Sequence, residues 1–374
     1  MSEIRVLQIV QSMNRGGIEN FIMNIYRHID REKIQFDFLL NEQNRSVFED
    51  EIEALGGIVY RMPRLKLSNP LKYIKAVDKF FKTHPEYKIC HSHYNAVSAI
   101  PLWLAKHNGI KYRISHSHTA IPKNRKTNKP RVIIWMLKLL LKKVAIHRFA
   151  CGKEAGKWLY GENAMNNGLV KIVNNAIEVD KFNFNPIIRN NIRKQLDVSD
   201  NTIVIGQIGS FSYIKNQHFT IDVLCKLRDI VSDVKCLFVG DGTLRPEIEQ
   251  YAKELGVADK CIFTGAVSNV CDYAQAMDVF LFPSFFEGLG ICAIEAQASG
   301  LKCFVSDGVP KECKVTDLVE FLPLSAGADE WAKNISNSCV YDRYGRYEEI
   351  RLAGYDAVAT AEELQEFYIN LLNH

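Results

Sequence analysis

The stretch VFLFPSFFEGLGICAIEAQASGL, residues 279–301, predicts a strand, a loop and a helix in succession. Its apolar start, Val279–Phe282, is typical of a buried strand, which ends at Pro283. The loop that follows contains Glu287 and two glycines, and the helix after it is rich in alanine. A buried strand that leads through such a loop into a helix is the repeating unit of a parallel, doubly wound sheet.

Two carboxylates make this stretch a candidate binding site. Glu287 lies in the loop, and Glu295 lies about two turns inside the predicted helix. Eight helical residues span roughly 12 Å, comparable to the separation between a sugar and a ribose across a diphosphate. Gly288 and Gly290 would let backbone N–H groups at the helix N-terminus approach an anion closely. The loop is therefore a candidate site for a nucleotide sugar.

Two other interpretations of the loop stay open. Glu-Gly is a common turn, and a single helix glutamate usually lies on a solvated face, so the spacing can be a coincidence. Gly288, Gly290 and Ala293 also satisfy a loose G-x-G-x-x-A, which is typical of a dinucleotide site. That fingerprint normally follows its strand at once, whereas four residues separate Pro283 from the first glycine here.

The composition predicts a globular protein of two domains. The chain has 374 residues, 47% of them hydrophobic and 24% charged, which is too long for one ordinary core. No apolar run approaches the length of a membrane span, and the start lacks the features of a signal peptide. The ten cysteines include no C-x-x-C pair, so neither disulfides nor structural zinc are expected. We expect a cytoplasmic protein.

Charge divides the chain unevenly. Residues 1–170 contain 28 Lys and Arg against 14 Asp and Glu, and the remainder contains 19 against 29. The two parts therefore carry +14 and −10, which predicts two domains with different partners. Because no recognisable motif interleaves aromatic residues with the basic charge, no nucleic-acid partner is expected.

Strands and helices alternate in both halves, with an Asn-rich pause between them. This pattern predicts an N-terminal domain over residues 1–175, a linker over 176–198 and a C-terminal domain over 199–343. Residues 344–374 are predicted to form a helical segment that returns to the N-terminal domain. Ligands bind at the carboxyl ends of the strands in open parallel sheets. The predicted strand ends are followed by Gly16, Gly17, His93, His118, Lys215, Asp241 and Glu287.

Five segments together resemble glycosyltransferase family 4, and the resemblance covers nearly the whole chain. These segments are VQSMNRGGIEN, IVNNAIEVDKF, IGSFSYIKNQ, FVGDGTLRPEIE and FFEGLGICAIEAQASGL. The last matches the family's E-x7-E signature. The resemblance implies the GT-B architecture, which is α/β with two facing Rossmann-like doubly wound parallel-sheet domains and an interdomain cleft. It also implies sugar transfer with retention of configuration, as in bacterial enzymes that build capsular or exopolysaccharide repeat units.

The resemblance implies that the N-terminal domain, residues 1–175, binds the acceptor and that the C-terminal domain, residues 199–343, binds the nucleotide sugar. It also implies a role for each motif residue. Gly16 and Gly17 would face the donor phosphates and leave room for the acceptor. His118 would lie beside the transferred sugar. Lys215 would neutralise the diphosphate, and Glu287 would contact the hydroxyls of the donor sugar. His118 and Glu287 are thus the candidate catalytic residues.

The remaining implied contacts belong to the nucleotide. Backbone amides at Leu289 and Gly290, after Gly288, would bind the phosphate, and Glu295 would bind the ribose. The base would be bordered by Gly240, Asp241 and Val267.

The chain departs from the family at one position of the donor site. The family usually has G-R-x-x-x-x-K, but here Ser210 occupies the arginine position, five residues before Lys215. A bidentate contact to the diphosphate is therefore missing, and a comparable stabiliser contributes about 3 kcal/mol in enzymes. Arg245 and Lys311 are candidate replacements. The alternatives are a degenerate nucleotide-sugar-binding paralogue with weak or no transfer, or a GT-B UDP-sugar epimerase.

Two histidine pairs, His91-Ser-His93 and His116-Ser-His118, admit three interpretations. Alternation along a strand would place each pair on one face, so they could be metal ligands, structural residues or substrate contacts. Neither spacing matches a known zinc motif, and no D-x-D motif is present. We expect no metal or cofactor, and we expect His93 or His116 to act with His118 in binding substrate.

The basic segment 123–148 contains nine Lys and Arg and no acidic residue. Its apolar residues fit either an anionic membrane surface or a core helix with a basic outer face. The expected partners are a nucleotide-sugar donor, UDP-linked by family habit, and a saccharide or polyprenyl-diphosphate-linked saccharide acceptor. A peripheral position on the inner face of the plasma membrane would suit the latter.

Overall fold

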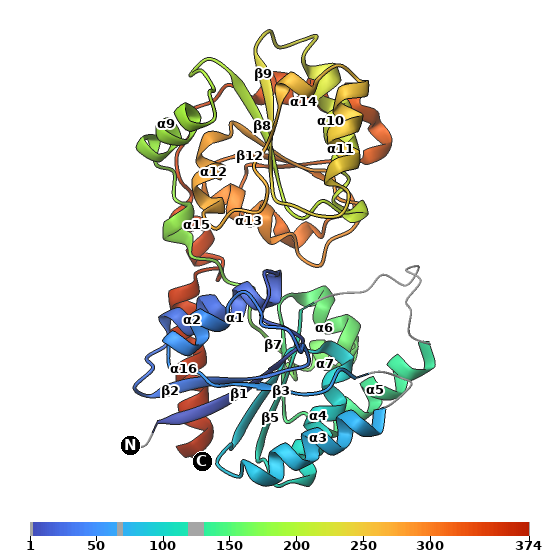
Figure 1. Ribbon diagram of the computed structural model, residues 1–374, viewed down its shortest axis with the longest axis vertical. Coiled ribbons are helices and arrows are strands. Elements are labelled where there is room, and N and C mark those ends of the chain that lie inside the picture. Colours follow the sequence, from blue (N-terminus) through green and yellow to red (C-terminus); the bar gives the residue numbers. More distant parts are fainter. Residues whose placement is uncertain (1–2, 66–69, 119–130, 374) are drawn as a thin grey trace. The chain divides into compact units, whose positions relative to one another are not determined.

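The computed structural model describes residues 3–65, 70–118 and 131–373 and divides the chain into two compact units. Unit 1 comprises Met1–Ile177 and Asp356–His374, and unit 2 comprises Glu178–Tyr355. Each unit is a parallel β-sheet with helices packed on both of its faces (Figure 1). These two Rossmann-like units are the architecture that the alternating strands and helices predict, so the predicted fold class is confirmed.

Unit 1 contains a seven-stranded sheet in the order β3-β2-β1-β4-β5-β6-β7. Its strands are β1 Ile4–Val10, β2 Ile34–Leu40, β3 Val59–Arg61, β4 Ile89–Ser92, β5 Tyr112–Ser117, β6 His147–Ala150 and β7 Lys171–Ile172. Its helices are α1 Gly17–His28, α2 Glu49–Ala54, α3 Pro70–Thr83, η1 Asn95–Ser98, α4 Ala99–His107, α5 Arg131–Val144, α6 Lys153–Tyr160, α7 Glu162–Asn166 and α16 Ala357–Asn373.

Unit 2 contains a six-stranded sheet in the order β10-β9-β8-β11-β12-β13. Its strands are β8 Ile203–Ile208, β9 Val234–Val239, β10 Cys261–Phe263, β11 Val279–Phe282, β12 Lys302–Ser306 and β13 Val319–Leu322. Its helices are α8 Val179–Phe182, α9 Pro186–Gln195, η2 Tyr213–Lys215, α10 Gln217–Leu227, α11 Arg245–Glu254, η3 Ala258–Lys260, α12 Val270–Ala276, α13 Ile291–Ala298, η4 Lys311–Cys313, η5 Leu324–Ala326, α14 Gly327–Ser338 and α15 Tyr347–Leu352.

Both sheets reverse their strand order beside their first strand. In unit 1, β1 pairs with both β2 and β4, and in unit 2, β8 pairs with both β9 and β11. The residues of the central strands are mostly buried because helices cover both faces of the sheet. Ligands of doubly wound sheets bind at this reversal, outside the carboxyl ends of the strands.

Most of the predicted linker over 176–198 lies in unit 2, which begins at Glu178. Asn185 caps α9, accepting hydrogen bonds from the N–H groups of Ile187 and Ile188. Two arginines of this helix then bind the carboxylate of Asp278, Arg189 at 2.6 Å and Arg193 at 3.2 Å. The polar, Asn- and Arg-rich composition of this segment predicts a connection between domains, but its arginines bind it to Asp278 of unit 2.

The segment predicted as residues 344–374 is divided between the units. Its first helix, α15, lies in unit 2, where the N–H of Arg346 donates to the carbonyl of Ala298 at 3.1 Å. The last helix, α16, packs against α1 in unit 1. Gln365 of α16 accepts a hydrogen bond from the N–H of Asp30 at 2.8 Å. Within the described ranges, no helix is both long and apolar enough to span a membrane.

Candidate active site

In unit 2, the site begins where the loops after β8 and β11 are tied together. The side-chain amide of Asn216 donates to the carbonyl of Pro283 at 3.1 Å. The N–H of Phe285 donates to the carbonyl of Ile214 at 2.8 Å. Because β8 and β11 are neighbours at the strand reversal, these bonds hold both loops at the expected ligand position.

Lys215 and Glu287, one from each loop, form an ion pair in this place. The Nζ atom of Lys215 lies 2.8 Å from Oε1 of Glu287, and both side chains are largely buried. The ammonium also lies 4.6 Å from the centre of the Phe282 ring. Gly209 has a φ of +147°, and a Cβ there would lie 3.0 Å from Cε of Lys215. Glycine therefore lets the lysine stem cross the end of β8.

A second carboxylate, Glu295, lies in the second turn of α13 and interacts electrostatically with Lys215. Burial raises the pKa of Glu295 to about 7, although the ammonium of Lys215 opposes the shift. Burial also opposes the charge of Lys215, but Cys292, Glu287 and Glu295 outweigh it and leave the lysine pKa raised. The site thus combines a permanently charged cation with a carboxylate that titrates near neutrality.

The N-terminus of α13 lies in the same place. Gly290 is its N-cap with a φ of +88°, and no side chain caps the helix. A Cβ at this position would lie 2.9 Å from Val309 and 3.2 Å from the Phe282 ring. The close packing and the left-handed conformation both require glycine. The first N–H groups of the helix, without a side-chain cap, suit an anion such as phosphate.

The other expected donor residues follow the neighbouring strands of the same sheet. Ser210 is exposed after β8, with its hydroxyl 3.5 Å from that of Ser212. Asp241 and Val267 follow β9 and β10. Both candidate replacements for the missing arginine have other contacts. Arg245 pairs with Glu249 at 2.6 Å and Asp241 at 3.5 Å, and Lys311 lies over the Phe321 ring.

In unit 1, four histidines of β4 and β5 form one buried cluster. The rings of His116 and His118 lie 4.0 Å apart, and those of His91 and His93 lie 4.3 Å apart. Phe21 of α1 packs against three of these rings. The sequence places them together because adjacent parallel strands each carry His-Ser-His, with both histidines on the same face.

Two of these histidines form a hydrogen-bonded chain that ends in an amide at each side. Nδ1 of His93 lies 2.7 Å from Nε2 of His118, whose Nδ1 lies 2.9 Å from the amide oxygen of Asn175. Nε2 of His93 lies 3.0 Å from the Gln8 amide. Burial lowers the pKa of His118 to about 4 and that of His93 well below its usual range. Each neutral ring carries one N–H, so the hydrogen bonds of the chain can all donate toward Gln8 or all donate toward Asn175. In either arrangement, the amide at the opposite end of the chain must donate.

Three ring nitrogens of this cluster, from His91, His93 and His116, lie within 4.8 Å of one another, close enough to hold a metal ion. The rings of His91 and His116 are nearly parallel at 9°, and that of His93 is tilted by 29° from His91 and by 38° from His116. Lone pairs lie in the ring plane, so stacked rings do not direct three nitrogens at one ion. His93 also uses both nitrogens in hydrogen bonds. The stacking of His91 on His116 and the two hydrogen bonds of His93 disfavour a metal centre.

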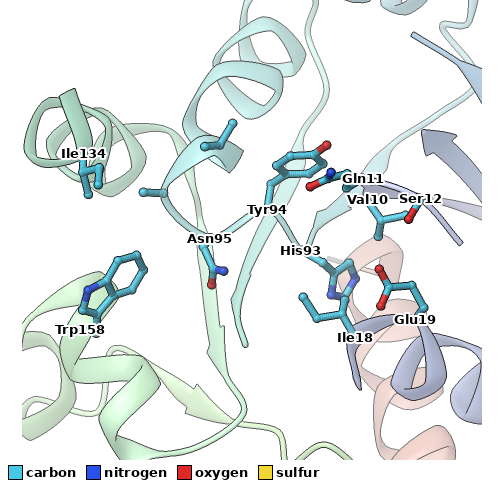
Figure 2. Close-up of a pocket in the computed structure, with 12 residues that line it drawn as sticks. Val10, Gln11, Ser12, Ile18, Glu19, His93, Tyr94, Asn95, Ile134 and Trp158 are labelled. Atoms are coloured by element: carbon cyan, nitrogen blue, oxygen red, sulfur yellow. The ribbon is translucent and has the colours of Figure 1, made fainter. Parts of the chain in front are cut away.

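Beside this cluster, unit 1 has a pocket of about 500 Å³ at the carboxyl ends of β1 and β4. Figure 2 shows His93, Ser12 and Glu19 at one end of it and Ile134 and Trp158 at the other. The pocket therefore has a polar end beside the histidine chain and an apolar end between α5 and α6.

Two family profiles match the chain, one in each unit. Residues 16–157 match the glycosyl transferase 4-like domain, and residues 188–320 match the glycosyl transferases group 1 profile. Over 371 residues, the chain is 30% identical to a putative glycosyltransferase of Bacillus subtilis (strain 168), EpsF. That alignment covers 98% of this chain and 97% of EpsF.

The chain belongs to the group 1 (family 4) glycosyltransferases.

Other relatives of this glycosyltransferase are more distant. It is 26% identical to the capsular polysaccharide biosynthesis glycosyltransferase CapH of Staphylococcus aureus, over 98% of this chain and 99% of CapH. It is 18% identical to an Escherichia coli UDP-Gal:alpha-D-GlcNAc-diphosphoundecaprenol alpha-1,3-galactosyltransferase, over 99% and 98% of the two chains. The crystal structure of Anabaena HepE with UDP and glucose has a TM-score of 0.78, with 19% identity over 98% of this chain and 99% of HepE. The likeness to HepE shows the GT-B fold.

Within each unit, the glycosyltransferase brings together most of the residues that its sequence predicts. Lys215 and Glu287 form an ion pair in unit 2, the charge of Lys215 acts on Glu295, and His93 lies on the pocket wall in unit 1. His116 is completely buried, with its ring 4.0 Å from that of His118, and it does not line the pocket.

Sequence reasoning missed four polar residues of unit 1. Asn175 and Gln8 end the histidine chain, and Asn95 accepts a hydrogen bond from the N–H of His118 at 3.1 Å. Glu19 lines the pocket. Glu19 and Asn175 lie within segments that resemble the family, but no spacing rule distinguishes them from ordinary polar residues of loops. Residues 123–130 of the basic segment lie outside the described residues.

The shifted pKa of Glu295 predicts a pH-dependent affinity for the donor. An ionised carboxylate accepts hydrogen bonds from two ribose hydroxyls, and a protonated one accepts more weakly. With Glu295 bound to the ribose, as the resemblance implies, donor binding favours the ionised form, so affinity for UDP-glucose should fall by up to about tenfold from pH 8 to pH 6. Titration calorimetry measures this, and UDP-glucose itself does not titrate in that range. Glu295→Gln should bind more weakly at pH 8 and show a flat profile; a flat wild-type profile would contradict the assignment.

Proposed function

We propose that this protein is a retaining glycosyltransferase that moves a sugar from a UDP-sugar to a saccharide acceptor linked to polyprenyl diphosphate. The Lys215–Glu287 pair at the strand reversal of unit 2 carries the proposal, since it places a cation and a sugar-binding carboxylate 2.8 Å apart. The names of the relatives support the finer points: UDP for HepE, capsular polysaccharide for CapH and a diphosphoundecaprenol acceptor for the E. coli enzyme. Synthesis of capsular or exopolysaccharide is the corresponding process.

The proposed chemistry depends on the leaving diphosphate. As the bond from the sugar to the phosphate breaks, negative charge develops on the terminal phosphate of UDP. Lys215 and the N–H groups at the start of α13 stabilise that charge, and Glu287 holds the hydroxyls of the sugar. The acceptor attacks from the face that the phosphate leaves, and a phosphate oxygen takes its proton. No metal is required for this step.

Two measurements test the proposal. A thermal-shift screen of UDP-, GDP- and ADP-sugars identifies the nucleotide, and we expect a shift with UDP-sugars. Release of UDP in the presence of lipid-diphosphate-linked saccharides then distinguishes transfer from the alternatives. A degenerate paralogue would bind the donor without turnover, and an epimerase would change the donor sugar without needing an acceptor. Either result would contradict the proposal.

We expect helix α5 to associate with anionic membranes. It exposes four large apolar side chains and has basic residues but no acidic one; the apolar residues are Val132, Trp135, Met136 and Leu139. An apolar face flanked by lysines favours the interface of an anionic bilayer. We expect co-sedimentation with vesicles containing about 30% anionic lipid, and weaker binding in high salt.

The double variant Trp135→Glu/Met136→Glu should lower the vesicle-bound fraction at least about fivefold, because it removes apolar area and adds repulsion. Trp103→Glu is the matched control, since Trp103 is an exposed tryptophan of the adjacent helix α4. Equal losses in both variants, or binding indifferent to lipid charge and salt, would refute the membrane assignment.

A further inference from the structure

The last helix of the chain, α16, contributes a buried tyrosine to the histidine cluster of unit 1. The side chain of Tyr368 is almost completely buried, and its hydroxyl oxygen lies 2.7 Å from Nδ1 of His91. The same hydroxyl forms a hydrogen bond with the side chain of Gln8, which ends the histidine chain through His93 and His118. Tyr368 therefore joins α16 to that chain.

The hydroxyl of Tyr368 suits both of its partners. A tyrosine hydroxyl donates one hydrogen bond and also accepts, and burial raises the pKa of Tyr368, so the proton is retained. Gln8 and His91 are buried, and Nε2 of His91 has no hydrogen-bond partner among the described residues. Because buried side chains cannot replace a lost partner with bulk water, the bonds to Tyr368 fix the position of the Gln8 amide.

Helix α16 is also attached near the other end of the histidine chain. The N–H of Ala357, its first residue, donates to the carbonyl of Ile177 at 3.0 Å. Ile177 closely follows Asn175, whose side-chain oxygen lies 2.9 Å from Nδ1 of His118. One helix thus holds the segments that contact both ends of the histidine chain.

We infer that Tyr368 is a positioning residue for sugar transfer and that it acts on His118 through the hydrogen bonds of the histidine chain. Tyr368 does not line the pocket of unit 1, so it acts by orienting the ring of His118 and not by touching substrate. A displacement of about 1 Å in a positioned group can lower a reaction rate about 100-fold. The inference rests on the proposed function for the role of His118 in transfer.

Tyr368→Phe tests this inference, because it removes the hydroxyl and keeps the ring that packs against Phe36. The turnover number should fall about tenfold, while the Kd for UDP changes less than about twofold. Gln8→Met should lower the turnover number to a similar extent. Because both substitutions interrupt the same chain, the double variant should lose little more than Gln8→Met alone. Losses that multiply in the double variant would overturn the inference.

Tyr26→Phe is the matched control in the same unit. The hydroxyl of Tyr26 donates to the side chain of a buried glutamine, Gln35, and to a backbone carbonyl, and its ring stacks on Phe36. Each variant loses a buried hydroxyl with two partners, so the melting temperatures should fall by similar amounts. Only Tyr368→Phe should lose turnover in the folded protein. Wild-type turnover in Tyr368→Phe, or an equal loss in Tyr26→Phe, would overturn the inference.

A measurement without substrate separates this inference from the proposed function. In NMR spectra of the protein labelled at histidine, the ring nitrogen signals of His118 are assigned by their loss in His118→Ala. These signals should shift in Tyr368→Phe and keep their positions in Tyr26→Phe. Unmoved signals would overturn the inference whether or not the wild type transfers sugar. Shifted signals in a wild type without transfer would support the link from Tyr368 to His118 and contradict the proposed function alone.

Discussion

Replacing His118 by alanine should lower the turnover number at least about 100-fold while leaving the affinity for UDP unchanged. The ring lies between His93 and Asn175, and its removal leaves polar atoms of both without a partner in a buried site. The N–H of His118 is held by Asn95, so the backbone can keep its place while the ring is lost. Apart from Gly16 and Gly17, the residues expected to bind UDP belong to unit 2, which the substitution does not touch.

The control for this variant is His91→Ala. His91 belongs to the same buried cluster and bonds to Tyr368 at 2.7 Å, but it is not part of the chain through His118. Both variants create a cavity and should lower the melting temperature by a similar amount. Only His118→Ala should lose turnover in the protein that remains folded. Wild-type turnover in His118→Ala, or an equal loss in both variants, would contradict a role for His118 in transfer.

Because His118 has a pKa of about 4, this role involves a neutral ring at physiological pH. A neutral ring whose two nitrogens are held by His93 and Asn175 is fixed in orientation, and neither nitrogen is free to accept a proton from a substrate. The expected contribution is therefore positioning and packing against the sugar rather than general base catalysis.

The sequence predicted most strands of both sheets because they contain short apolar runs that end at a polar loop, but it did not predict the edge strands β7 and β13. The stretch from Val279 to Ala298 forms the predicted strand β11, loop and helix α13. The apolar runs do not predict the order of the strands in each sheet, but parallel βαβ connections limit that order to a few arrangements. The two boundaries that differed, at α9 and α15, depend on arginine contacts to another part of unit 2.

The candidate site was predictable in part for the same reason. Lys215 and Glu287 lie 72 positions apart in the numbering, yet both follow neighbouring strands, so a rule about strand ends places them together. No such rule predicts their ion pair, the neutral chain through His118 or the hydrogen bond between Tyr368 and His91. Those features depend on side-chain conformations in three dimensions.

Replacing Lys215 by methionine should weaken binding of UDP-sugars about 100-fold and lower the turnover number further. With Ser210 exposed and Arg245 held by two carboxylates, the ammonium of Lys215 is the main charge available to the diphosphate. Methionine keeps the stem that crosses Gly209 but leaves the carboxylate of Glu287 without its cation. Calorimetry with UDP-glucose measures the affinity, and UDP release measures the turnover.

Lys226→Met is the control, since Lys226 lies on the surface of unit 2 in an exposed ion pair with Asp329 at 3.0 Å. Exposed pairs contribute little, so this variant should bind UDP-glucose like the wild type. Lys215→Met has a second expected signature. Because the ammonium lowers the pKa of Glu295, its loss should raise that pKa above 7 and shift the pH dependence of the residual binding upward. Undiminished affinity with an unshifted profile would show that the diphosphate binds away from Lys215, and the assignment of the donor site would then fail.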